Sequence, residues 1–238
     1  PGEVFNETVK TLTKNQTVAA INSLNQSLNR ISGRMNYIRS TNNNSSNQNI
    51  RLAMNFDNQL LAQQINSLSA KLLKKEKETE KWGVWSEGSI SFGRIGQQDG
   101  NLGQDIHSDG ITFGIDKKIN EDKTIGFAIN KSWQETEVGS NEANMDAATI
   151  SIMNYTSFKI EDKRFFEMVA GIGEMNIDLS RDVTSGKNKG DRKGNQLFGS
   201  FTYLLEPDVE IVGRNLNYYS RLDLGFTQLK AYTETGDG

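Results

Sequence analysis

The sequence predicts an all-β fold, an antiparallel transmembrane β-barrel, which follows an α-helical linker. The first observation behind this prediction is a division in composition. Residues 1–81 contain two glycines and three aromatic residues, whereas residues 82–238 contain twenty glycines and seventeen aromatic residues. The second is that the spacing of apolar residues changes at this boundary from about 3.6 to about 2. The third is that many of the period-2 segments run for about ten residues, the length that a tilted strand needs to cross a bilayer.

Composition also excludes several classes of function. The chain has no cysteine, which excludes disulfide scaffolds and thiolate metal sites. Its net charge of −3 argues against a nucleic-acid binder, because such domains are usually strongly basic. We therefore expect no cofactor, no metal ion and no nucleic-acid partner.

The first 81 residues are predicted to form two helices, over residues 4–39 and 50–80, with an asparagine-rich loop between them. The first helix has apolar residues at alternating steps of three and four, namely Ile21, Leu24, Leu28, Ile31, Met35 and Ile38. The second repeats this spacing at Leu61, Ile65, Leu68 and Leu72. We expect each helix to pack within its own molecule. The alternative is a coiled-coil oligomer, although neither seam lasts beyond about three heptads.

Asparagine is frequent in this helical region, with fourteen residues among the first 81. Asparagine is a poor helix former compared with alanine or leucine. Helices of this composition would not be stable alone in water, so their surroundings must support them. A polar, water-containing tunnel would suit them better than an apolar core.

Seven strands are predicted, over residues 82–95, 110–116, 125–134, 147–158, 164–180, 195–206 and 215–230. In the second and third strands, one face is apolar and carries Ile111, Phe113, Phe127 and Ile129. The opposite face carries glycine, threonine, alanine and asparagine. An apolar face toward lipid and a polar face toward a wet lumen are typical of a membrane barrel. A spanning sheet must close, because lipid cannot hydrogen-bond to a free edge.

The connections between the predicted strands alternate in length. Residues 96–108, 137–145 and 181–194 form long connections, and residues 120–124 and 159–163 form short ones. This alternation is typical of outer-membrane barrels. The last long connection is predicted to be an exposed loop with four basic residues, Lys187, Lys189, Arg192 and Lys193. Three tryptophans lie near strand ends, where an interfacial girdle would place them: Trp82, Trp85 and Trp133.

Several segments, taken in order, resemble the autotransporter β-domain, the translocator of type V secretion. Residues 82–93 and 110–116 resemble its opening strands, and residues 165–173, followed by Arg181, resemble its mid-barrel strand. Residues 218–226 are followed by Tyr232-Thr-Glu-Thr-Gly236, which is similar to the family's Tyr-x-Glu-x-Gly ending. Upstream, residues 15–39 are similar to the helix that precedes the barrel, with arginines at Arg30, Arg34 and Arg39.

The resemblance implies a twelve-stranded, monomeric barrel with a helix through its pore, of which this chain holds about seven strands. It implies a location in the outer membrane of a Gram-negative bacterium, contact with lipid, insertion by the barrel-assembly machinery, and export of an upstream passenger. Residues 1–81 would be the linker and the tail of the passenger, and residues 82–238 a partial barrel. We therefore expect the chain to be a piece of a longer protein. We assign the pore to the second helix, because it leads directly into Trp82.

We expect no enzymatic activity. Some members of the family cleave their own linker at an Asn–Asn bond, helped by lumenal carboxylates. The chain has an asparagine run at Asn42, Asn43 and Asn44, and its presumed lumenal carboxylates are Glu87, Asp116, Glu167 and Asp223. Both features are ordinary in loops and barrels, so self-cleavage is the less favoured alternative. His107 has no second histidine or cysteine to complete a metal site, and we expect it in a surface loop.

Two further classes of function stay open at this point. One is a surface-exposed β-rich adhesin with a helical stalk and no membrane insertion, and the other is a porin-type channel. Lipid contact of the apolar face would separate a translocator from the first. A helix inside the pore would separate it from the second.

Overall fold

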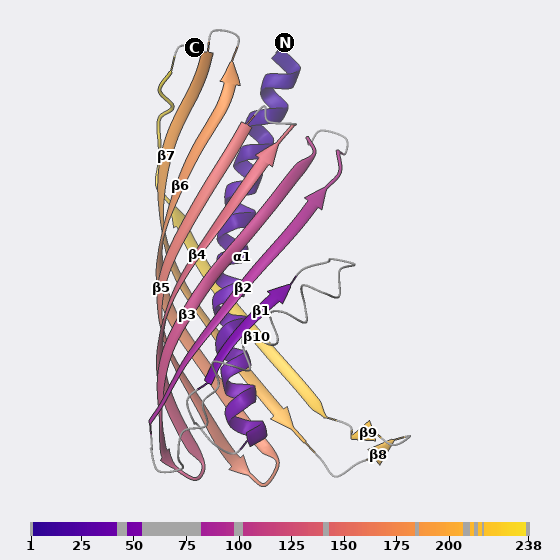
Figure 1. Cartoon of the computed structure of the whole chain (residues 1–238), viewed down its shortest axis with the longest axis vertical. Helices are drawn as coiled ribbons and strands as arrows, with labels where there is room; N and C mark the ends of the chain where they lie inside the picture. Colours follow the sequence, from indigo (N-terminus) through magenta and orange to yellow (C-terminus); the bar gives the residue numbers. More distant parts are fainter. Residues whose placement is uncertain are drawn as a thin grey trace.

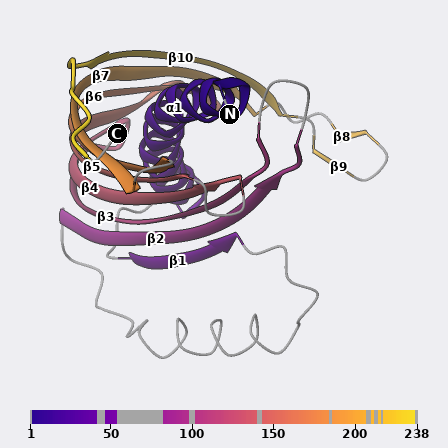
Figure 2. The ribbon, with the colours of Figure 1, turned by 90° about the horizontal axis from the view of Figure 1, so that it is seen from above.

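The computed structural model describes residues 2–41, 47–53, 82–97, 102–139, 143–183, 186–206, 210–211, 214–215 and 217–236. A long helix, α1 (Gly2–Thr41), runs along the concave face of a strongly curved sheet (Figure 2). The helix and the strands extend along the same long axis (Figure 1). Within the described part of the chain, no helix is long and apolar enough to cross a membrane.

The sheet contains eight strands in the order β1-β2-β3-β4-β5-β6-β7-β10. Their bounds are β1 (Asn47–Ala53), β2 (Trp82–Ile95), β3 (Gln104–Asn120), β4 (Lys123–Val138), β5 (Ala143–Glu161), β6 (Arg164–Val183), β7 (Gly186–Leu205) and β10 (Tyr218–Leu229). All neighbours are antiparallel except β1, which lies parallel to β2. Strands β8 (Glu210–Ile211) and β9 (Arg214–Asn215) form a separate small sheet. In the described residues the large sheet is open, with β1 and β10 at its edges.

All seven predicted strands are present, and five of them are longer than predicted. The two short turns are confirmed between β3 and β4 and between β5 and β6. The long loop predicted over residues 181–194 is wrong, because β6 continues to Val183 and β7 starts at Gly186. The four basic residues assigned to that loop therefore lie on β7.

The helical predictions have a mixed outcome. The first predicted helix is present as α1, and all of its apolar seam is buried except Ile21, which is 51% exposed. Residues 50–53 belong to β1, so the second predicted helix is wrong at its start. Residues 54–81, and the asparagines at 42–44, lie outside the described residues.

The outer face of the sheet carries a continuous apolar belt. One row of paired residues crosses six strands and consists of Phe113, Ile129, Ile152, Ile172, Leu197 and Phe226. Each of these side chains is more than half exposed. Trp82 and Trp133 also lie on this face, but Trp85 is only 3% exposed and points inward, so the girdle prediction is wrong for Trp85.

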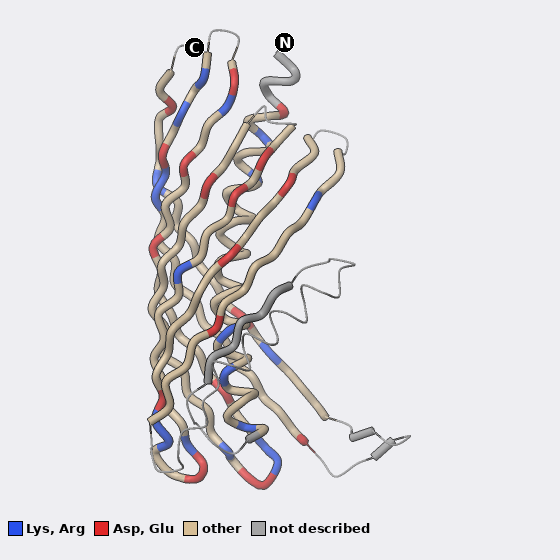
Figure 3. The backbone as a smooth tube through the Cα atoms, viewed as in Figure 1, with Lys and Arg blue, Asp and Glu red and all other residues tan. Residues whose placement is uncertain are grey.

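The polarity of the two faces inverts toward the end of the sheet at which α1 begins. On β6, Met175, Ile177 and Leu179 are buried on the inner face. Charged residues gather there on the upper parts of β6 and β7, as they do at the short turns (Figure 3). The missed strand ends have a related cause: between residues 181 and 194 both faces are largely polar, with Arg181, Asn188 and Arg192 on the inner face, so no alternation of polarity marks the strands there.

Large aromatic side chains on the inner face fit against glycines. A Cβ added at Gly126 would lie 2.1 Å from the Tyr155 ring, and one at Gly114 would lie 2.3 Å from the Trp85 ring. Contacts this short do not occur between real atoms, so the two rings occupy space that any other residue would need. The glycines of these strands therefore let aromatic rings lie flat on the wall beside α1.

Gly126→Ala is expected to lower the free energy of unfolding by about 1–3 kcal/mol, because overpacking a filled interior displaces its neighbours. The measurement is the urea concentration at the midpoint of unfolding, for the purified full-length protein in detergent. Unfolding is followed by the electrophoretic mobility of unheated samples. The matched control is Gly93→Ala, where an added Cβ meets nothing within 4 Å. Equal midpoints for the two variants would contradict the packing role of Gly126.

Candidate functional site

The candidate site is the inner face of the sheet, where α1 is bound. The helix has 40 residues, which corresponds to about 60 Å of length at 1.5 Å per residue. Its C-terminal part carries Arg30, Arg34 and Arg39, all of which contact the inner wall. The prediction that the second helix occupies this position is therefore wrong, since α1 fills the concave face. Connectivity to β2 favoured the wrong helix, whereas the arginines identify the right one.

The most buried polar contact joins Arg34 of α1 to Asp116 of β3. Arg34 donates through Nε and Nη2 to the two carboxylate oxygens of Asp116, at 2.7 and 2.9 Å. The two side chains are 1% and 0% exposed. Such a bidentate pair fixes both distance and orientation.

Two aromatic residues complete this buried network. The Tyr155 hydroxyl donates to Asp116 Oδ2 at 2.7 Å, and Trp85 Nε1 donates to the Tyr155 oxygen at 2.7 Å. The Trp85 ring also lies 6.0 Å from the centre of the Arg34 guanidinium group. Asp116 therefore accepts hydrogen bonds from both Arg34 and Tyr155, which offset the loss of water around a buried carboxylate.

Arg39, nearer the helix end, binds two further carboxylates. Its Nη1 lies 2.6 Å from Glu167 Oε1, and its Nε lies 3.0 Å from Glu206 Oε1. Glu167 is 3% exposed, whereas Glu206 is 34% exposed in its side chain. The helix end is thereby joined to β6 and to the residue after β7.

Arg30, one turn before Arg34, binds neutral groups. It donates to Ser89 Oγ at 2.5 Å, to Asn130 Oδ1, and to Thr112 Oγ1 at 3.5 Å. Further toward the start of the helix, the groups of α1 that make polar contacts with the wall are uncharged. Asn130 donates to Ser27 Oγ at 3.0 Å, and Gln196 donates to the Ala20 carbonyl at 3.2 Å.

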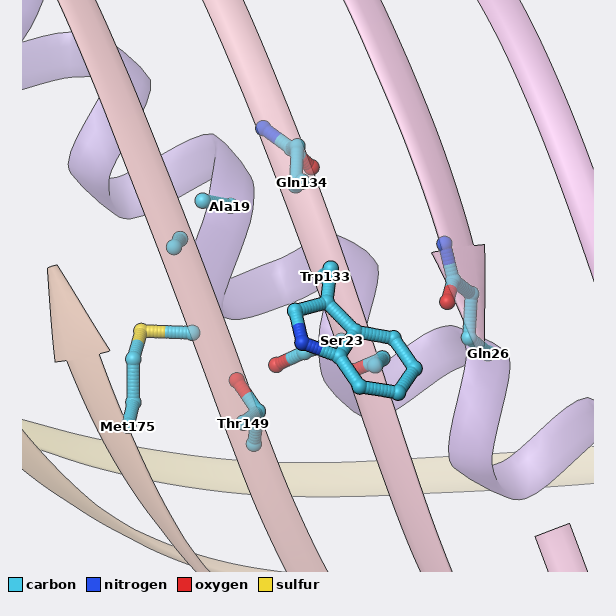
Figure 4. Close-up of a pocket in the computed structure, with 9 residues that line it drawn as sticks. Ala19, Ser23, Gln26, Trp133, Gln134, Thr149 and Met175 are labelled. Atoms are coloured by element: carbon cyan, nitrogen blue, oxygen red, sulfur yellow. The ribbon is translucent and has the colours of Figure 1, made fainter. Parts of the chain in front are cut away.

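The first half of α1 lies against an apolar part of the wall. Its buried residues share one cluster: Leu12, Ala19, Ala20, Val138, Ala143, Met145, Ala147, Met175, Ile177 and Leu179. A small cavity lies where this cluster meets the polar wall, lined by Ala19, Ser23, Gln26, Ser132, Trp133, Gln134, Ala147, Thr149 and Met175 (Figure 4). Its volume of about 10 Å³ has room for about one water molecule.

The four predicted lumenal carboxylates are not assembled into a catalytic group. Asp116 and Glu167 are held by arginines of α1, and Asp223 accepts hydrogen bonds from Ser200 at 2.6 Å and Arg221 at 2.7 Å. Glu87 is 3% exposed on the inner face of β2. Among the described residues, no group of three histidine, cysteine or acidic side chains could hold a metal ion.

His107 lies on β3 and not in the predicted loop. Its ring is on the outer face, where it lies 4.3 Å from the Phe92 ring. Sequence reasoning also missed the Arg34–Asp116 pair. Its signal was present, since Arg30 and Arg34 share a helix side at a step of four, and Asp116 is the one charge on its face of the predicted strand 110–116.

Comparisons with known proteins agree with this geometry. The family model described as the autotransporter β-domain matches residues 84–238. Among solved structures, the chain is similar to the translocator domain of the autotransporter NalP from Neisseria meningitidis, with a TM-score of 0.55 and 13% sequence identity. That match covers 74% of this chain and 58% of the NalP domain, so the chain spans little more than half of that domain.

No curated protein sequence matches the chain significantly. The family model nevertheless covers well over half of the chain, and the fold agrees with it: antiparallel strands, an apolar outer belt and a helix on the inner face. The chain belongs to the autotransporter β-domain family.

Proposed function

We propose that this chain is the linker helix and part of the barrel of an autotransporter translocator, which anchors in the outer membrane of a Gram-negative bacterium and exports an upstream passenger. The observation that carries the proposal is the contrast between the two faces of the sheet. The outer face presents a row of six large apolar side chains, and the inner face binds α1 through buried ion pairs. A porin-type channel would not be expected to bind a helix along its inner wall. A soluble adhesin would not be expected to expose an apolar surface of this size to water.

The extension of the strands beyond the apolar belt gives the orientation. The turns after β3 and β5 lie at the end of the sheet where α1 ends, at the bottom of Figure 1, and at the opposite end β6 and β7 continue past the belt as charged strands, to Val183 and from Gly186. Outer-membrane barrels extend farther on the extracellular side, whereas their periplasmic turns are short. The start of α1 then lies on the outer side of the membrane, where a passenger joined to it would be displayed.

Two further parts of the proposal concern partners and chemistry. We propose a monomeric barrel inserted by the barrel-assembly machinery, as the family membership implies. We also propose that the chain has no catalytic activity. This is supported by Asp116 and Glu167, whose carboxylates are engaged by arginines.

Ile172→Lys tests contact of the belt with lipid. A lysine at the centre of a membrane belt is expected to cost about 2–4 kcal/mol. The full-length protein should therefore show a lower yield in the outer-membrane fraction and a lower urea midpoint in lipid vesicles. The matched control is Asp178→Lys on the same strand, where the outer face is polar. If both variants insert as well as the unaltered protein, the belt does not contact lipid.

Arg34→Gln tests the binding of α1 to the wall. Removing one partner of a buried ion pair is expected to cost about 3–5 kcal/mol, because Asp116 stays buried without a counter-charge. Trypsin should then cleave α1 in the membrane-inserted full-length protein at its remaining basic residues. Adding Asp116→Asn should restore part of the protection, since no charge is left unpaired.

The matched control is Arg94→Gln, which removes an ion pair with Asp105 whose side chains are 79% and 50% exposed. Exposed pairs contribute about 0–1 kcal/mol, so protection of α1 should not change. Equal protection in the Arg34 and Arg94 variants would show that α1 is not held in the lumen by this pair.

A further inference from the structure

The segment that follows β10 returns to the wall at the end of the sheet where α1 begins. Lys230 N donates to the Lys193 carbonyl at 2.8 Å, and Thr235 and Lys189 exchange two backbone hydrogen bonds of 2.8 Å. The residues from Tyr232 to Gly236 therefore lie against the upper part of β7 (Figure 1).

Tyr232 fits into a space that a glycine leaves open. A Cβ at Gly190 would lie 2.9 Å from two atoms of the Tyr232 ring. The ring lies 5.4 Å from the centre of the Arg192 guanidinium group and packs against the apolar cluster that holds Leu12, Ala19 and Ala20 of α1. Tyr232 thus contacts the part of the wall that supports the first half of the helix.

Arg192 links this segment to the helix itself. Its Nε donates to the Lys230 carbonyl at 2.6 Å, and its Nη1 donates to Gln16 Oε1 of α1 at 2.6 Å. Gln16 is 1% exposed, so this hydrogen bond from a charged donor is buried on the helix side. Residues 2–29 of α1 contain no arginine, and among the described residues no ion pair joins this part of the helix to the wall.

Glu234 and Gly236 complete the attachment of the segment. Arg181 of β6 donates through Nε and Nη2 to Glu234 Oε2, with the Nε contact at 2.9 Å. A Cβ at Gly236 would lie 2.6 Å from the Lys187 carbonyl oxygen, so only glycine fits there. Each of Tyr232, Glu234 and Gly236 therefore has its own contact with the upper wall.

We propose that the segment Tyr232-x-Glu234-x-Gly236 is a positioning clamp for the first half of α1. It acts through Arg192 on Gln16 and through Tyr232 on the apolar cluster, independently of the ion pairs of Arg34 and Arg39. The inference rests on the proposed function only in taking α1 as the helix that is held in the lumen.

The experiment uses two single spin labels on the full-length protein in vesicles. Lys14→Cys places a label on the exposed side of the first half of α1, and Ser40→Cys places one at the end of the helix. Residues 1–238 contain no cysteine that would compete for the label. Arg192→Gln, Tyr232→Leu and Glu234→Gln are each expected to remove the immobilised component of the spectrum at residue 14 and to leave residue 40 unchanged. Arg34→Gln should remove the immobilised component at residue 40 and leave the spectrum at residue 14 unchanged.

Three further variants separate the clamp from general damage. Lys189→Gln, whose side chain is exposed beside the clamp, should change neither label. Tyr232→Phe should also change neither, because the ring makes the contacts. Exchanging the charges, Arg181→Glu with Glu234→Arg, should restore the immobilised component that Glu234→Gln removes.

The outcomes are distinguishable. If residue 14 stays immobile in Arg192→Gln and Glu234→Gln while both assemble, the clamp does not exist. If Tyr232→Leu fails to assemble, these two variants and the charge exchange decide the question. If both labels are mobile in the unaltered protein, the proposed function fails first, because α1 is then not held in the lumen.

Discussion

The buried pair of Arg34 and Asp116 is the interaction on which the rest of the structure depends. A charge removed from water is costly unless its partner and its remaining hydrogen bonds are all in place. Asp116 obtains these from Arg34 and Tyr155, Tyr155 is in turn bonded to Trp85, and its ring has room only because residue 126 is a glycine. The pair also fixes the helix along its axis. A slip of one turn would move Arg34 by about 5.4 Å and leave both charges unpaired. Arginine suits this role better than lysine, because its planar group binds both carboxylate oxygens at once.

The two faces of the sheet follow from two different surroundings. Where the belt of Ile129, Ile152 and Ile172 faces outward, polar groups can be satisfied only inside, and the inner wall there holds Thr112, Asn130 and Ser151. Toward the start of α1 the outer face is charged and the inner wall is apolar, which is the arrangement of a protein in water. The same strands therefore extend from the membrane into water while they stay paired in the sheet. The helix passes through both regions and changes with them, from arginines at its end to Leu12, Ala19 and Ala20 in its first half.

Much of the fold could be predicted from the sequence, and the failures have physical causes. Period 2 identified the seven antiparallel strands of the large sheet, because one face had to be apolar wherever lipid was expected. It placed the upper ends of β6 and β7 wrongly, because residues 181–194 are largely polar on both faces and show no alternation. Trp85 was assigned to the membrane surface by its residue type and its place near a strand end, whereas its ring lies inward in the space left by Gly114. The helix in the lumen was misassigned because connectivity was weighed above charge. The pairing of Arg34 with Asp116 depends on how far a 40-residue helix extends along a curved wall, which spacing in the sequence does not give.

The distribution of contacts along α1 also bears on how a linker could both move through a lumen and come to rest in it. Contacts between neutral side chains, such as those of Ser27 and Asn130, exchange readily with water, because their net contribution is only about 0.5–1.5 kcal/mol each. They let an asparagine-rich helix pass along the wall without a deep energy minimum. The bidentate pair of Arg34 and Asp116 is different, since it forms only in one register and is then buried from water. Arg34 and Arg39, which make the ion pairs with the wall, lie in the last third of the helix, so these ion pairs form only when nearly the whole helix has reached its place. In the proposed function, the first part of the helix, which makes no ion pair with the wall among the described residues, would allow passage, and the ion pairs of the last part would provide the stop.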